Sequence, residues 1–229
     1  MAMTGWLKMA VVGVVKAIAG LLLGLQVYQR ERLPATGPAI LVANHNSHLD
    51  ALVLMALYPL GMAARLRPVA NEQYFLHHGA LLAWFARQVL AIIPVTCAPA
   101  LTGGRPHRAF LQTCDAALAQ RHILILFPEG SRGEPERLGE FHSGIAHLAK
   151  RHPTVPVVPI FLHGLGKAMP KGDPLLVPFV CGVAIGPALY WAGCKRTFLH
   201  DLTAHIQTLS RQFGAADPSP RDRGEAAAP

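Results

Sequence analysis

Charged residues are scarce in this sequence, and acidic residues are the scarcest. Of 229 residues, 15% are charged, and the 13 Asp and Glu residues are outnumbered by 21 Lys and Arg. The formal net charge is therefore +8 at pH 7. This balance favours anionic partners, such as acidic phospholipid, a phosphorylated cofactor, an acidic carrier protein or nucleic acid. Charge alone does not choose among these partners.

Cysteine is also rare. The four cysteines form no CxxC pair and follow no regular spacing. That pattern argues against a disulfide framework and fits a reducing compartment. There is also no G-x-S-x-G motif, so a serine hydrolase of the elbow type has little support. Hydrophobic residues make up 52% of the chain, which is more than an average soluble domain carries. We expect this excess to meet a membrane surface or an apolar ligand.

The most apolar segment lies near the start of the chain, at Met9–Val27, and only Lys16 and Gln26 interrupt it. It approaches the roughly 20 residues that span a bilayer, but a central lysine costs about 2.5–3.5 kcal/mol on insertion. Lys8 and Lys16 lie on one side of a helix, which leaves an apolar face free. We expect an N-terminal helix that associates with the membrane interface, with a full span or a cleaved signal as alternatives.

Beyond residue 34, short apolar runs alternate with amphipathic stretches. The expected strands are Ala39–Ala43, Leu66–Ala70, Ala91–Val95, Ile123–Phe127, Val155–Phe161 and Val180–Ile185. The expected helices are Leu49–Leu57, Gly79–Leu90, Arg105–Arg121, Ser143–Arg151 and Thr197–Phe213, with Asn46 or Ser47 as the cap of the first. Apolar strands separated by helices predict an α/β fold, with a mixed, largely parallel sheet covered by helices.

A polar motif, Asn44-His45-Asn46-Ser47-His48-Leu49-Asp50, directly follows the first of these strands. Ligand sites of α/β proteins gather at the carboxyl ends of strands. A histidine there with a carboxylate five residues on forms a base that an acid orients. Two alternatives remain: the pair only ends the strand and starts the helix, or His45, His48 and Asp50 bind a metal.

A second polar motif, Phe127-Pro128-Glu129-Gly130-Ser131-Arg132, follows the clearest strand. Gly130 allows close approach to the backbone, Ser131 offers a hydroxyl, and Arg132 offers a two-pronged donor for phosphate oxygens. Glu129 is expected to hold that arginine or to bind a polyol. The alternative is an ordinary turn with a salt bridge. We expect the two motifs to share one face of the sheet.

These motifs resemble those of the glycerolipid acyltransferase family typified by 1-acylglycerol-3-phosphate acyltransferases (PlsC-like). Asn44-His45 with Asp50 is similar to its NHxxxxD signature, and 127–132 is similar to its F-P-E-G-[TS]-R motif. Two further blocks resemble the family in the same order: Phe141, Gly144 and Ala149, and then Val155–Ile160. The resemblance covers roughly residues 37–186.

The resemblance implies an O-acyltransferase of the family's fold. His45 would be the general base on a lysophospholipid hydroxyl, and Asp50 would orient it. Asn44, Ser47, Glu129, Gly130, Ser131 and Arg132 would form the substrate-binding set. Acyl-CoA or acyl carrier protein would be the co-substrate, with no cofactor, metal or covalent acyl-enzyme. The acyltransferase domain would occupy 34–213, between a membrane-associating segment (1–33) and a disordered tail (214–229).

Two departures from the family pattern concern the phosphate of the acceptor. In the family, a block between the two main motifs commonly ends in arginine. The corresponding stretch here is Leu90–Thr96, and no arginine follows it before Arg105. A lysine that is frequent in the family after the phenylalanine of the third block is here His142. Both changes remove cations, so we expect a weaker preference for lysophosphatidate. The competing functions are a noncatalytic basic membrane-binding protein and a thioesterase that uses the same His–Asp pair. We expect no nucleic-acid partner and a location at the cytoplasmic face of the inner membrane.

Overall fold

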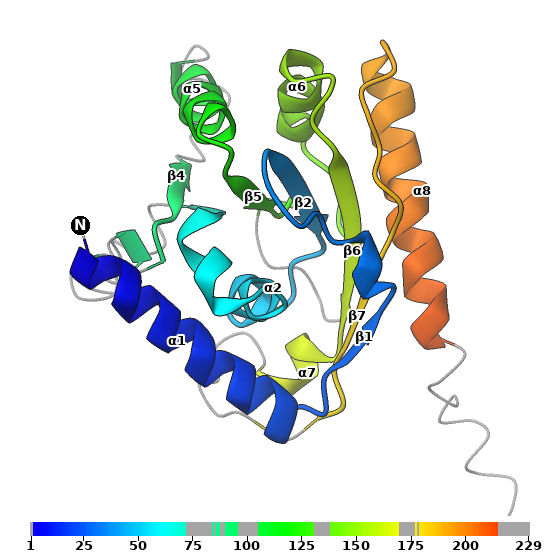
Figure 1. The fold of residues 1–229 in the computed structure, drawn as a ribbon. Helices are drawn as coiled ribbons and strands as arrows, with labels where there is room; N and C mark the ends of the chain where they lie inside the picture. The colour runs from blue at the N-terminus through cyan, green and yellow to red at the C-terminus, as the bar shows by residue number, and fades with distance from the viewer. Residues whose placement is uncertain are drawn as a thin grey trace, which may run out of the picture.

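A computed structural model describes residues 2–71, 84, 86, 87, 90–95, 105–130, 138–169, 177 and 179–214 of the chain (Figure 1). Its centre is a seven-stranded sheet in the order β1-β7-β6-β2-β5-β3-β4. The strands are β1 (Gln26–Tyr28), β2 (Ala39–Ala43), β3 (Leu66–Asn71), β4 (Ile93–Val95), β5 (Ile123–Leu126), β6 (Val157–His163) and β7 (Gly182–Ile185). Every pairing is parallel except that of β6 with β7. The expected mixed, largely parallel sheet is confirmed.

The sheet is buried on both faces because its central strands are apolar at every position. In β2, Leu41 belongs to one core and its neighbours Ile40 and Val42 belong to the other. The first core is closed by α1 (Ala2–Leu21), α2 (Asp50–Ala56), η2 (Leu60–Arg65) and α7 (Leu165–Ala168). The second is closed by α5 (Arg105–Ala119), α6 (Gly144–Arg151) and α8 (Lys195–Gly214).

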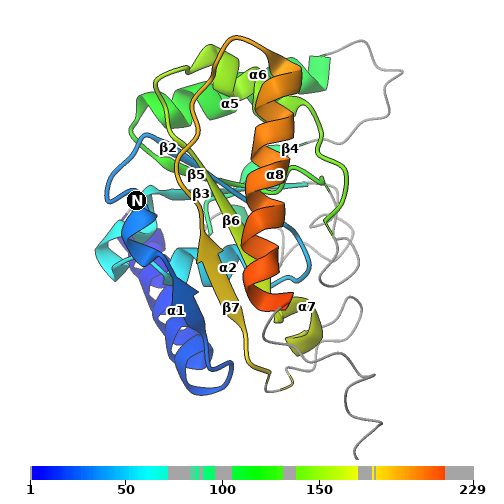
Figure 2. The same ribbon diagram turned by 90° about the vertical axis from the view of Figure 1, so that its right-hand side faces the viewer.

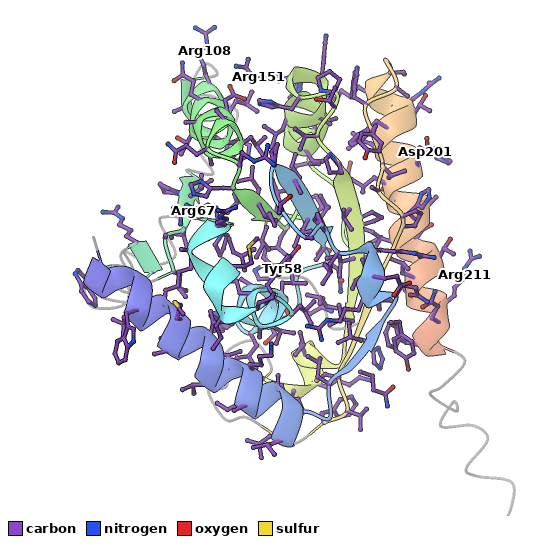
Figure 3. All side chains as sticks on the ribbon, viewed as in Figure 1. Tyr58, Arg67, Arg108, Arg151, Asp201 and Arg211 are labelled. Carbon is purple, nitrogen blue, oxygen red and sulfur yellow. The ribbon has the colours of Figure 1, made fainter. Side chains whose placement is uncertain are left out.

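The covering helices are amphipathic, as their sequence periodicity predicts. Figure 2 shows α8 running along the sheet over β6 and β7, where Leu202 and Ile206 are buried. The charged side chains Arg108, Asp201 and Arg211 extend outward from α5 and α8, and Arg151 of α6 reaches toward α5 (Figure 3), where it pairs with Asp115. The expected strands and helices within the described residues agree with the structure to within about two residues at most ends. The helix expected at 79–90 lies largely outside the described residues.

The first 33 residues are built into the fold through two elements that the sequence did not predict. Strand β1 pairs with β7 and forms one edge of the sheet, and η1 (Arg30–Arg32) follows it. Arg30 and Arg32 donate to the carbonyl oxygens of Leu57 (2.6 Å) and Ile185 (3.1 Å), respectively. Their guanidinium groups therefore tie this segment to the domain.

Helix α1 packs on α2 and η2 (Figure 1), and both of its lysines bond to backbone carbonyl groups of the domain. Lys8 is 2% exposed, and its Nζ donates to the carbonyl oxygens of Leu66 (2.7 Å) and Leu90 (2.8 Å). The Nζ of Lys16 donates to the carbonyl of Tyr58 at 3.4 Å (Figure 3 labels Tyr58). The outward side carries the exposed apolar residues Trp6, Val14, Leu21 and Leu22. Within the described residues, no helix combines the length and apolar character needed to cross a membrane.

Lys8 gives the stability of the fold a pH dependence. Burial, with a smaller contribution from the guanidinium of Arg67, lowers the pKa of Lys8 to about 7. In the unfolded chain, Lys8 keeps its proton up to about pH 10. Between about pH 7 and pH 10 the unfolded chain therefore binds more protons than the folded chain. The free energy of unfolding consequently rises with pH in this window. We expect the Tm of the wild type to rise more than that of Lys8→Met between about pH 7 and 8.5.

Calorimetry of both proteins across this window measures the difference in slope. Lys16→Met is the matched control, since it removes a lysine from the same helix at an exposed position. Equal slopes for the wild type and Lys8→Met would contradict the assignment.

Candidate active site

The two polar motifs leave the sheet side by side because the strands before them are parallel neighbours in register. Val42 of β2 pairs with Leu126 of β5, so the chain after each strand emerges at the same edge. The expectation that the motifs share one face is confirmed for residues 44–50 and 127–130. Ser131 and Arg132 lie outside the described residues.

Asp50 organises the first motif. It is completely buried at the start of α2, and its Oδ2 accepts hydrogen bonds from the backbone N–H groups of Asn46 (2.6 Å) and Ser47 (2.8 Å). The Nδ1 of His45 lies 2.9 Å from the same oxygen. A carboxylate only accepts hydrogen bonds, so this contact places the histidine proton on Nδ1 and leaves Nε2 as the basic nitrogen.

The imidazole of His45 has a stacking partner on its face in addition to the hydrogen bond from its edge to Asp50. The ring of Phe127 stacks on it with centroids 4.2 Å apart and planes 20° from parallel. The side chain of His45 remains 23% exposed, so a second molecule has access to it. The stacking role of Phe127 was not predicted, although its place in the second motif is a usable signal. A histidine oriented in this way, with an accessible nitrogen, is suited to general-base chemistry.

Asn44 fixes the end of β2 against β6. Its side-chain amide donates to the carbonyl of Leu162 (2.9 Å) and accepts from the N–H of the same residue (2.7 Å). The amide thereby extends the β2–β6 ladder by one pair, beyond the partners Ala43 and Ile160. Asn44 is fully buried, so these contacts give it a structural place beneath the site.

Ser47 is part of the turn that leads into α2. Its hydroxyl donates to the carbonyl of Met169 (3.2 Å) and accepts from the N–H of Leu49 (3.3 Å). The prediction that Asn46 or Ser47 caps the helix is wrong. Leu49 occupies the N-cap position, and the hydroxyl of Ser47 accepts from the N–H of Leu49 and not from an N–H group inside α2.

Glu129 lies beneath the two motifs and joins them. It is 8% exposed, and its Oε1 accepts from the N–H of His45 at 3.4 Å. Burial raises the pKa of Glu129 to about 7, and the negative charge of Asp50 adds to this, while the bond from His45 opposes it. Glu129 contacts the backbone of the histidine, which the sequence did not predict.

Gly130 requires glycine for two reasons. Its φ is +72°, a conformation that side chains disfavour, and an added Cβ would lie 2.9 Å from Cδ2 of His142. The N–H of His142 donates to the carbonyl of Pro128 (2.8 Å), which holds this histidine against the loop. His142 therefore packs against Gly130, and the close approach of a ligand to this backbone stays a prediction.

The sequence left open that His45, His48 and Asp50 bind a metal ion together. Across the described ranges, no three His, Cys, Asp or Glu side chains gather closely enough to hold a metal ion. The Nδ1 of His45 instead lies 2.9 Å from Oδ2 of Asp50.

Comparison with known proteins places this arrangement in a family. Residues 24–163, which include both motifs, match the family model described as Acyltransferase. The chain belongs to the Acyltransferase family. The match spans β1 to the end of β6. It therefore includes β2 and β5 and the segments after them, in which His45, Asp50 and Glu129 lie.

Individual family members are similar over part of their length. The chain is 31% identical over 144 residues to a chloroplastic 1-acyl-sn-glycerol-3-phosphate acyltransferase of Brassica napus, covering 62% of this chain and 38% of that protein. It is 27% identical over 176 residues to 1-acyl-sn-glycerol-3-phosphate acyltransferase alpha of Bos taurus, covering 76% and 58%. This chain thus spans less than two thirds of the length of these relatives.

A solved structure shows the same fold. The 1-acyl-sn-glycerophosphate (LPA) acyltransferase PlsC from Thermotoga maritima superposes with a TM-score of 0.69 at 18% identity, covering 91% of this chain and 81% of that chain.

The raised pKa of Glu129 predicts how stability depends on pH. Between about pH 4.5 and 7 the folded state keeps a proton that the unfolded state loses, so stability falls as pH rises through this window. We expect Glu129→Gln to remove this loss, so that its Tm relative to the wild type increases from pH 4.5 to pH 7.

Thermal unfolding at several pH values in this window measures the effect. Glu140→Gln is the control, because Glu140 is exposed. A constant difference in Tm between Glu129→Gln and the wild type would show that the carboxyl group titrates normally.

Proposed function

We propose that this protein transfers a fatty acyl group from a thioester to the hydroxyl of a 1-acylglycerol-3-phosphate or a related lysolipid. The observation that carries the proposal is the His45–Asp50 pair, 2.9 Å apart, at the edge where β2 and β5 end. The names of the similar proteins from Brassica napus and Bos taurus support the lysolipid acceptor. The product would be a phospholipid of membrane biosynthesis.

His45 acts as the general base in this proposal. Its Nε2 takes the proton of the acceptor hydroxyl, while the Nδ1–H donates to Asp50, which stabilises the imidazolium. The hydroxyl oxygen attacks the thioester carbonyl carbon, and the resulting tetrahedral intermediate breaks its C–S bond. The departing thiolate then takes the proton from His45. The sequence of steps needs no metal ion, no cofactor and no covalent acyl-enzyme.

The two substrates meet the remaining residues of the site. Acyl-CoA or acyl carrier protein supplies the thioester, and its anionic parts are compatible with a chain of net charge +8. Glu129, Gly130, Ser131 and Arg132 bind the polar head of the acceptor, with Arg132 as the phosphate ligand. With a single arginine in this role, acceptors of lower charge compete better with lysophosphatidate.

The membrane surface is the proposed location of the reaction, at the cytoplasmic face of the inner membrane. The support comes from α1, whose outward side carries Trp6, Val14, Leu21 and Leu22 while Lys8 and Lys16 bond inward. Exposed apolar side chains on one side of a helix favour burial in the interfacial layer of a bilayer. Acceptor and product would then enter and leave within the membrane plane.

The mechanism predicts the effect of changing the pair. We expect His45→Ala to reduce lysolipid-dependent thiol release by roughly 10²–10⁴-fold, because a general base contributes about this much. Asp50→Asn should also lose much of the rate through the wrong tautomer of His45. The thiol released from acyl-CoA is measured through its reaction with a chromogenic disulfide.

His200→Ala provides the control, since the side chain of His200 is 80% exposed on α8. We expect it to keep wild-type activity. If His45→Ala kept its folded structure and near-wild-type turnover, the catalytic assignment would be wrong.

The proposed membrane contact predicts a separate effect. We expect the double variant Trp6→Glu with Leu21→Glu to weaken binding to vesicles of anionic phospholipid by about tenfold or more, because two apolar side chains lose their burial in the bilayer. Sedimentation of the protein with vesicles measures this.

Tyr190→Glu is the matched control, since it adds a carboxylate at an apolar residue that is 53% exposed and lies away from α1. Equal vesicle binding by the double variant and the wild type would refute the contribution of α1.

A further inference from the structure

Asn46, next to the histidine, is buried, and its side chain has no hydrogen-bond partner among the residues that the structure describes. It is 2% exposed, and within those residues neither its Nδ2 nor its Oδ1 is bonded. Asn44, two residues earlier, shows the ordinary case, since both ends of its amide are bonded to Leu162. Burying an unpaired amide opposes folding, so such groups require an explanation.

The backbone contacts around Asn46 hold it in this position. Its own N–H donates to Oδ2 of Asp50, and the N–H groups on either side, those of His45 and Ser47, donate to Glu129 and Asp50. The segment is therefore anchored through its main chain by the carboxyl groups of the site. The side-chain amide of Asn46 is thereby held one residue from the basic histidine, with both its donor and its acceptor buried and unbonded within the described residues, so a ligand reaches them only if the loop shifts to admit it.

We propose that Asn46 is a substrate-binding residue whose carboxamide pairs with the pantetheine thioester arm of the acyl donor. This inference rests on the proposed function and assigns part of the donor subsite. A carboxamide has one donating and one accepting end and carries no charge. The pantetheine arm offers carbonyl oxygens for Nδ2 and amide N–H groups for Oδ1, so a single ligand satisfies both ends.

The head group of the acceptor is a poorer match for Asn46. A phosphate offers only accepting oxygens, so it satisfies Nδ2 but leaves Oδ1 facing negative charge. The nearby carboxylate of Asp50 adds to this mismatch with an anion. The pairing of donor and acceptor ends therefore favours the thioester arm over the phosphate.

Asn46→Leu, which keeps the approximate size of the side chain, tests the proposal by two readouts. We expect its KM for acyl-CoA to rise about tenfold, through the loss of one or two hydrogen bonds, with the KM for lysophosphatidate little changed. We also expect the Tm of the ligand-free protein to rise, because a buried unpaired amide is replaced by an apolar group. If the leucine variant does not fold, the KM values for acyl-CoA and lysophosphatidate are measured with Asn46→Ala.

Asn44→Leu is the matched control, since it removes an amide of the same kind that is fully paired. We expect its Tm to fall, because it leaves the backbone groups of Leu162 without partners. A fall in Tm for Asn46→Leu with both KM values unchanged would overturn the proposal and make Asn46 a structural residue, held by buried water. A rise confined to the KM of lysophosphatidate would overturn it in favour of the acceptor.

Binding of coenzyme A, measured by titration calorimetry, separates this inference from the proposed function. Weaker binding of coenzyme A by Asn46→Leu supports the donor contact even if the wild type transfers no acyl group, in which case the proposed function fails alone. If the wild type transfers acyl groups and Asn46→Leu binds coenzyme A normally with an unchanged KM for acyl-CoA, the inference fails and the proposed function stands.

Discussion

The site depends on the buried carboxylate of Asp50. One of its oxygens accepts from the imidazole of His45 and from the backbone N–H groups of residues 46 and 47. The same atom therefore shapes the loop, begins α2 and selects the tautomer of the histidine. Because these three hydrogen bonds meet at one oxygen, the geometry of the loop and the orientation of the imidazole are coupled.

The parallel pairing of β2 with β5 is the second constraint. It delivers the two motifs to one edge, where Glu129 accepts from the backbone of His45 and Phe127 stacks on its ring. The base is thus held at its edge by Asp50, at its face by Phe127 and at its main chain by Glu129. Rigid support of this kind is what keeps a base in a productive orientation.

The sequence predicts most of this architecture because the decisive signals are local. The apolar run at 39–43 identifies β2, and the spacing of His45 and Asp50 identifies the pair. The partners of buried groups are not predictable in this way, because they depend on residues far along the chain. Lys8 bonds to carbonyls 58 and 82 residues away, and Asn44 bonds to Leu162. Strand β1 was missed because Gln26 and Val27 read as the end of the N-terminal apolar segment, whereas α1 ends at Leu21, and a strand of three residues is too short to show a period.

The central claim is acyl transfer to a lipid hydroxyl with His45 as the base, and analysis of the products tests it most directly. Wild-type protein is incubated with acyl-CoA and lysophosphatidate in mixed micelles, and the new ester, the free fatty acid and the released thiol are quantified by mass spectrometry. The account predicts one new phosphatidate for each thiol released, with release that requires the acceptor. Free fatty acid formed in place of the ester, at a rate independent of lysolipid, would contradict it and indicate a thioesterase.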